Sequence, residues 1–118
     1  ELLEFVGLSG RERLLAKELP TAAQKRLELA RALATKPELL LLDEVMAGLT
    51  HTEITQSLDL IRKIRDKGIT VIMIEHVMKA IMGLSERIMV LHHGEKIAEG
   101  TPSEIATSKT VIKVYLGE

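Results

Sequence analysis

The chain has 118 residues, 46% of them hydrophobic, which is enough to bury a modest core and argues against disorder. Its 16 Lys and Arg residues balance 17 Asp and Glu residues, so no excess positive charge indicates a nucleic-acid surface. Cysteine is absent and no stretch resembles a secretory leader, which gives disulfide stabilisation and secretion no support. The apolar runs fall far short of the roughly 20 residues that cross a bilayer. We therefore expect a cytoplasmic protein that meets a membrane only through partner chains.

Two helices are predicted in the first third of the chain. Residues 1–8 place apolar side chains on one broad face, and the first residue is not Met, so we expect a helix that belongs to a longer protein. A second helix is predicted from Thr21, with Thr21 as N-cap and Gln24 completing a capping box. This helix should end near Thr35, because Pro37 disfavours helical geometry at the residue before it.

The middle of the chain reads as strand, helix and strand. Residues 39–42 are four consecutive leucines, the pattern of a strand buried on both faces in a parallel sheet. An amphipathic helix is predicted over residues 54–66 with Gly68 just beyond its end. The stretch "ITVIMIEH", residues 69–76, is a second apolar strand. In such a unit the two strands are parallel, so their charged carboxyl ends meet at one edge of the sheet.

The last third is predicted to contain a β-hairpin between short helices. A helix over residues 77–84 precedes two short strands that flank His93 and Gly94, a sequence typical of a hairpin turn. Thr101 provides the N-cap of a further short helix, with proline next and a capping glutamate three residues on. A last helical segment is predicted over residues 110–118.

The charged residues at the two strand ends are the candidate functional residues. Asp43 and Glu44 follow the leucine strand, and His76 follows the next strand. One carboxylate near a metal ion and one near an attacking water is what Mg²⁺-assisted phosphate chemistry requires, and an imidazole can donate a hydrogen bond to a terminal phosphate. The alternative is purely structural: acids that are merely solvated at a strand end, and a histidine with a packing role.

Several longer stretches together resemble a known family. "ELLLLDE", "AGLT" and "VIMIEH" resemble the second half of an ABC-type ATPase domain. "LLDEVMAGL", "EHVMKAIMGLSERIMVLHHGEKIAEGTPSEI" and the terminal "VYLGE" are similar to the ATP-binding subunits of branched-chain amino acid uptake transporters. The resemblance implies an α/β fold, a partial P-loop NTPase core of parallel strands with flanking helices plus a C-terminal hairpin. It also implies that residues 1–118 are the C-terminal part of one ABC ATPase domain. Residues 1–36 would hold the remnant of the helical subdomain and the signature helix, and residues 37–118 the Walker B motif, the D-loop, the switch histidine and the C-terminal region.

By resemblance, three residues take defined roles in catalysis. Asp43 matches the Walker B aspartate that holds Mg²⁺, and Glu44 matches the glutamate that polarises the hydrolytic water. His76 is similar to the switch histidine that senses the γ-phosphate. The cofactors implied are ATP and Mg²⁺.

Two further motifs imply nucleotide contacts across a dimer interface. Residues 47–50 match the D-loop, so Gly48 and Thr50 are expected near nucleotide, although Thr50 stands where Asp or Asn is usual. Residues 19–23 occupy the signature position but read Leu-Pro-Thr-Ala-Ala in place of a sequence like LSGGQ. Thr21, Ala22 and Ala23 keep a hydroxyl and amides that can hold phosphate at a helix start. The alternative at this position is a plain helix cap.

No GxxxxGK[ST] sequence occurs, so the phosphate-cradling loop is expected upstream of this chain. We expect part of an ATPase subunit that energises an importer of branched-chain amino acids. The chain should be inactive by itself, and the subunit should lie at the inner face of the cell membrane. Its expected partners are a second ATPase subunit and membrane-spanning permeases. One alternative is a non-enzymatic dimerisation or docking module. Another is a chromosome-maintenance ATPase, which needs a heptad coiled coil that residues 1–19 do not show.

Overall fold

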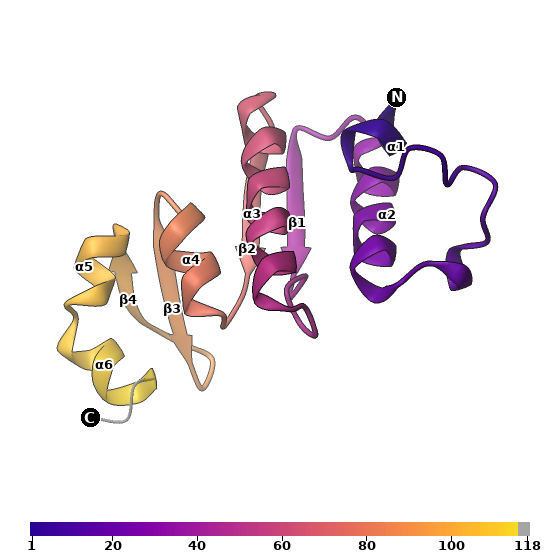
Figure 1. Ribbon diagram of the computed structural model, residues 1–118. Coiled ribbons are helices and arrows are strands. Elements are labelled where there is room, and N and C mark those ends of the chain that lie inside the picture. Colours follow the sequence, from indigo (N-terminus) through magenta and orange to yellow (C-terminus); the bar gives the residue numbers. More distant parts are fainter. Residues whose placement is uncertain (116–118) are drawn as a thin grey trace. The chain divides into compact units, whose positions relative to one another are not determined.

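The computed structural model describes residues 1–115 and divides into two compact units, Glu1–His76 and a second unit from Val77 onward (Figure 1). Each unit has its own two-stranded sheet. The first unit contains, in chain order, α1 (Leu2–Phe5), the 3-10 helix η1 (Ala16–Glu18), α2 (Thr21–Leu33), β1 (Leu39–Asp43), α3 (His51–Asp66) and β2 (Thr70–Ile74). The second unit contains α4 (Met78–Leu84), β3 (Ile88–His92), β4 (Glu95–Gly100), α5 (Pro102–Ala106) and α6 (Lys109–Tyr115).

Strands β1 and β2 are parallel, and α3 connects them, as the sequence predicted. Leu39 pairs with Thr70 at one end of the ladder, and Asp43 pairs with Ile74 at the other. A parallel pair requires a crossover of a dozen or more residues, which the 16-residue helix α3 provides. The two strands therefore finish together at one edge of the sheet.

The core of the first unit lies on one face of this sheet. Leu40 and Leu42 point inward and are buried, as are the α3 residues Leu58, Ile61 and Ile64. The prediction that the leucine strand is buried on both faces is wrong for this chain. Leu39 and Leu41 alternate with the buried pair and are 49% and 68% exposed, because no described element of the first unit covers that face.

The start of α2 differs from the predicted capping box. The N-cap is Pro20, whose ψ of 160° gives the extended backbone that a cap residue needs, so Thr21 is already helical and no side chain caps the helix. The Gln24 amide does not reach back to a cap; it donates to the carbonyl oxygens of Leu19 at 3.1 Å and Ala16 at 3.2 Å. Helix α2 ends at Leu33, close to the predicted end.

Helix α3 starts three residues earlier than predicted and stops where predicted. Thr50 is its N-cap and Asp66 its last residue. Gly68 follows with φ of +92°, a left-handed conformation that favours glycine, so the predicted glycine stop is confirmed.

The second unit is a β-hairpin packed against short helices. His93 and Gly94 both have positive φ, which is the turn geometry that suits a tight hairpin. The Thr101 cap of α5 is confirmed: the Glu104 N–H donates to Thr101 Oγ1 at 3.3 Å. The core of this unit consists of Ile88, Ile105 and Val111. The predicted last helix is present as α6 up to Tyr115, whose hydroxyl donates to the Leu91 carbonyl; residues 116–118 of that prediction lie outside the described residues.

Within residues 1–115 no helix has the length and apolar character needed to cross a bilayer. The expected division of the chain into residues 1–36 and 37–118 concerns motifs rather than packing and stays a prediction.

One ion-pair cluster in the second unit leads us to expect a pH-dependent contribution to stability. Glu99 accepts hydrogen bonds from Lys96 Nζ at 3.0 Å and Arg87 Nε at 2.8 Å. The hydrogen bond from Lys96, then that from Arg87, holds the pKa of Glu99 below its ordinary value. A carboxyl group with a depressed folded-state pKa contributes stability above its unfolded-state pKa, and this contribution is lost as the pH falls through the folded-state pKa.

We therefore expect Glu99→Gln to lower the melting temperature slightly at neutral pH, with the difference vanishing in strong acid. Glu95→Gln removes the same charge from the same strand and is the control. Thermal unfolding followed by circular dichroism across a pH series measures both. A Glu99→Gln difference that persists unchanged in acid would contradict this assignment.

Candidate functional site

The backbone leaves the extended conformation directly after β1. Asp43 is the last residue of this strand. The next residue, Glu44, donates its N–H to the Ile74 carbonyl at 2.8 Å, so the parallel ladder continues one bond beyond the strand. Glu44 has φ of +51°, an uncommon conformation for a residue other than glycine. The adjacent carboxylates of Asp43 and Glu44 therefore lie at the edge of the sheet where the strands end, and both residues are exposed.

The structure brings Glu44 and His76 together. Glu44 Oε1 lies 3.4 Å from His76 Nδ1, with side chains 53% and 68% exposed respectively. An exposed pair of this kind contributes little to stability. Its significance is geometric, because an exposed carboxylate and an exposed imidazole from two different strand ends lie next to each other.

The loop after Glu44 is ordered by its own backbone and by one buried side chain. Met46 is 1% exposed and anchors the loop in the core. The Ala47 N–H donates to the Glu44 carbonyl at 3.3 Å, and the Leu49 N–H donates to the Met46 carbonyl at 3.2 Å. Gly48, with φ of +78°, has no heavy atom within 4 Å of the position a Cβ would take. The constraint on Gly48 is therefore its backbone conformation.

Thr50 is a helix cap in this structure. The Glu53 N–H donates to Thr50 Oγ1 at 3.2 Å, and the Thr50 N–H donates to Glu53 Oε2 at 2.8 Å, a complete capping box. Threonine therefore caps the start of α3, a position that Asp and Asn also favour. A contact of Thr50 with nucleotide stays a prediction.

The three signature-position residues lie in the first turn of α2. Thr21 is exposed, Ala22 half-buried and Ala23 buried. The amides of a first helical turn have no partner within their own helix. In the described part of the chain, no hydrogen bond or ion pair joins these residues to Glu44 or His76. Their predicted role toward phosphate is untested by this structure.

Glu75 belongs to the same strand end as His76, and sequence reasoning passed over it. Its carboxylate accepts hydrogen bonds from the Met46 N–H and the His76 N–H, both at 3.3 Å. The sequence signal for Glu75 was its position between the strand and His76. Its contact with Met46, 29 positions away, cannot be predicted from local sequence pattern.

The acidic residues fit part of a Mg²⁺ site. Mg²⁺ prefers oxygen ligands and commonly uses one or two carboxylates together with water and substrate phosphates. Asp43 and Glu44 present such exposed oxygens at the strand edge. Among residues 1–115, no three His, Cys, Asp or Glu side chains gather closely enough to hold a metal alone. A metal here would therefore depend on ligands from water and phosphate.

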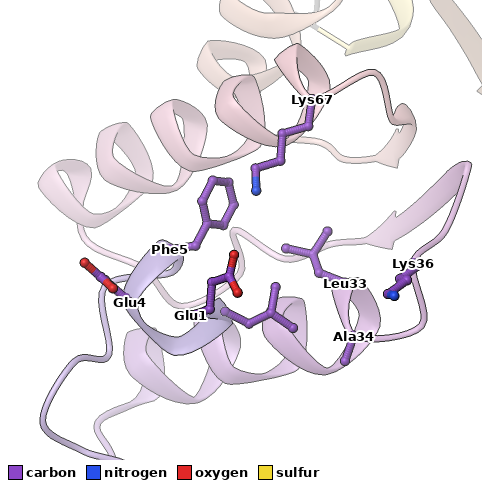
Figure 2. Close-up of a pocket in the computed structure, with 8 residues that line it drawn as sticks. Glu1, Glu4, Phe5, Leu33, Ala34, Lys36 and Lys67 are labelled. Atoms are coloured by element: carbon purple, nitrogen blue, oxygen red, sulfur yellow. The ribbon is translucent and has the colours of Figure 1, made fainter.

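A separate surface pocket of about 550 Å³ in the first unit contains none of the predicted site residues. In Figure 2 Lys67 extends toward the Phe5 ring, and its Nζ lies 4.0 Å from the ring centroid, a cation–π contact. The pocket is lined by Glu1, Leu2, Glu4, Phe5, Leu33, Ala34, Lys36 and Lys67. Because its lining carries both acidic and basic side chains, the pocket favours neither an anionic nor a cationic ligand.

Comparison with known proteins gives a consistent result. Residues 95–118 match a family model described as branched-chain amino acid ATP-binding cassette transporter. Over 117 residues the chain is 44% identical to the high-affinity branched-chain amino acid transport ATP-binding protein LivG of Salmonella typhimurium, covering 98% of this chain and 46% of LivG. The chain thus spans about half the length of the curated relatives that it matches.

Solved structures agree. The crystal structure of the ADP conformation of an ATP-binding cassette of an ABC transporter matches with a TM-score of 0.90 and 30% identity, covering 99% of this chain and 48% of that one. CbiO1 from Clostridium perfringens, part of the ABC transporter complex cbiONQ, matches with a TM-score of 0.83 and 26% identity, covering 95% of this chain and 45% of that one. The resemblance inferred from the motifs and the α/β fold of a partial ABC ATPase core are both confirmed.

The capping box makes a direct prediction about Thr50. Thr50→Ala removes the oxygen that accepts the Glu53 N–H, so we expect the free energy of unfolding to fall by about 1 kcal/mol. Thr50→Asp retains an acceptor and should cost much less. Thr52→Ala, two residues into the same helix, should be neutral or slightly stabilising because alanine has the higher helix propensity. Urea unfolding of the three variants measures this; equal losses for Thr50→Ala and Thr52→Ala would contradict the cap.

Proposed function

We propose that this chain, which resembles the C-terminal part of the ATP-binding proteins of branched-chain amino acid transporters, supplies the metal and water end of an ATP-hydrolysing site. The observation that carries the proposal is the convergence of Asp43, Glu44 and His76 at one sheet edge, with 3.4 Å between Glu44 Oε1 and His76 Nδ1. The similarity to LivG over 98% of the chain supports the same function.

The three side chains divide the chemistry between them. Asp43, as the last residue of β1, offers carboxylate oxygen to Mg²⁺, directly or through water. When bound there, Mg²⁺ would supply neutralisation of the negative charge on the phosphates. Glu44 accepts a proton from, and orients, the attacking water. His76 donates a hydrogen bond toward the γ-phosphate while its Nδ1 faces Glu44, so the imidazole responds to the presence of that phosphate.

The loop and the start of α2 are proposed to act on a second nucleotide. Gly48 and Thr50 lie on the loop that would cross to a partner ATPase subunit. The γ-phosphate of the ATP held by that partner would bind at the start of α2, because helix starts favour anions. The groups that would contact it are the amides of Thr21, Ala22 and Ala23 and the Thr21 hydroxyl. Pro20 offers neither hydroxyl nor N–H, so this contact is expected to be weaker than one made by a serine and glycines.

The cellular role follows from the same similarity. We propose that ATP hydrolysis by the complete subunit drives import of branched-chain amino acids through separate permease chains. CbiO1 is part of an ABC transporter complex, which supports assembly with such chains. The subunit would then lie at the inner face of the cell membrane, held there by the permeases.

One observation favours a second function, a non-enzymatic docking or dimerisation module. The residue before α2 is the N-cap Pro20, which offers neither a hydroxyl nor an N–H group to a phosphate, and this weakens the phosphate contact expected there. The convergence of Glu44 and His76 favours the ATPase, because a docking module has no need of it.

The chain by itself should bind Mg-ATP very weakly, because its sequence contains no phosphate-cradling loop and those contacts dominate nucleotide affinity in P-loop proteins. Isothermal titration of the 118-residue chain with Mg-ATP should give no binding tighter than about 1 mM. Sub-micromolar binding would show that the chain carries a phosphate site of its own.

A chimaera in which this chain replaces the matching part of LivG tests the catalytic assignment. We expect the chimaera to hydrolyse ATP, and Glu44→Gln to retain ATP binding while turnover falls by at least about 100-fold, because the amide keeps the shape but not the basicity. Glu38→Gln, at the opposite end of β1, is the charge-matched control. Glu44→Gln turnover within a few-fold of the parent would reassign the base, and an inactive parent chimaera would favour the docking module.

A further inference from the structure

Glu75 joins two segments that carry the proposed catalytic residues. It is half-buried and follows β2 directly. Its Oε2 accepts the N–H of Met46, in the loop after β1, and its Oε1 accepts the N–H of His76, each at 3.3 Å. The two oxygens of one carboxylate thus bridge the two chain segments that meet at the sheet edge.

The bridge closes a short and strained stretch of backbone. Glu44 is held at one side by its N–H bond to Ile74 and has φ of +51°. Met46 is held at the other side by Glu75 and by its buried side chain. Only Val45 lies between them, so the backbone from which the Glu44 side chain extends is held by anchors on both sides. A non-glycine residue in the left-handed region persists only where its surroundings hold it there.

The chemistry of the bridge requires a carboxylate. Both groups facing Glu75 are N–H donors, and an ionised carboxylate offers two acceptor oxygens and no donor. Hydrogen bonds of this charged type are also stronger than neutral ones. Glutamine has nearly the same shape but carries an NH₂ group in place of one oxygen, so whichever of the two amides faces that group loses its acceptor.

We infer that Glu75 is a positioning residue: it fixes the loop after β1 against the His76 backbone and thereby holds the Glu44 carboxylate 3.4 Å from the imidazole. This inference rests on the proposed function, in which Glu44 orients the attacking water. Glu75 itself contacts two backbone amides and need not touch nucleotide. Its loss should therefore misdirect Glu44 without removing any group that binds ATP.

The first experiment tests the bridge in the 118-residue chain. Amide hydrogen exchange followed by NMR reports on the Met46 and His76 N–H groups separately. In Glu75→Gln, at least one of the two should exchange about tenfold faster, the cost of one charged hydrogen bond, while Leu58 in α3 stays within about twofold. Glu38→Gln should change neither amide. Unchanged exchange at both Met46 and His76 would overturn the bridge.

The second experiment tests its consequence in the LivG chimaera. Glu75→Gln should lower kcat about tenfold and leave the KM for ATP within about twofold, since a misdirected group costs turnover rather than ground-state binding. A merely structural role would lower the folded fraction and leave the kcat of the folded enzyme intact. Glu75→Asp, which keeps both oxygens on a shorter stem, should recover part of kcat and is the variant to use if Glu75→Gln does not fold.

The outcomes separate this inference from the proposed function. An active parent chimaera whose kcat is unaffected by both Glu75 variants overturns the positioning role alone. A parent chimaera that is folded but without ATPase activity overturns the proposed function and the inference with it. Faster amide exchange together with lower kcat and unchanged KM supports both.

Discussion

The parallel pairing of β1 with β2 is the constraint on which the site depends. Because Asp43 pairs with Ile74, the residues that follow both strands emerge at the same edge, and the Glu44 N–H adds a further bond to the Ile74 carbonyl. Side chains alternate along a strand, so a slip of one residue would exchange the faces of Leu40 and Leu41 and expose the core. The hydrophobic pattern that buries Leu40 and Leu42 therefore also sets where Glu44 meets His76.

The polar groups at this edge differ in exposure and in what they contact. Glu44 and His76 are exposed and lie close to each other, whereas the half-buried Glu75 accepts hydrogen bonds from two backbone amides. This division is physically reasonable, because exposed charges are free to act on a ligand but are weakly oriented by the pair they form. Orientation then has to come from groups tied to the backbone, which is the role the structure offers for Glu75 and for the buried side chain of Met46.

Local sequence pattern predicted the parts of this fold that local physics decides. The β-branched run before Glu75, the His93–Gly94 turn and the Thr101 cap depend on neighbouring residues, and all three are confirmed. The capping box at Thr21 failed because Pro20 competes for the cap position. Burial of Leu39 and Leu41 depends on what covers the sheet, which local pattern does not contain. The convergence of Glu44 with His76 followed from parallel topology, whereas the Glu75 bridge to Met46 needed coordinates.

The most direct test of the central claim is the hydrogen bond that extends the ladder beyond β1. NMR scalar coupling across hydrogen bonds, measured on the isotope-labelled 118-residue chain, identifies which carbonyl accepts the Glu44 N–H. The register predicts coupling between the Glu44 amide nitrogen and the Ile74 carbonyl carbon. Coupling to the carbonyl of Met73 or Glu75 instead would place β1 and β2 in another register and would contradict the site described above.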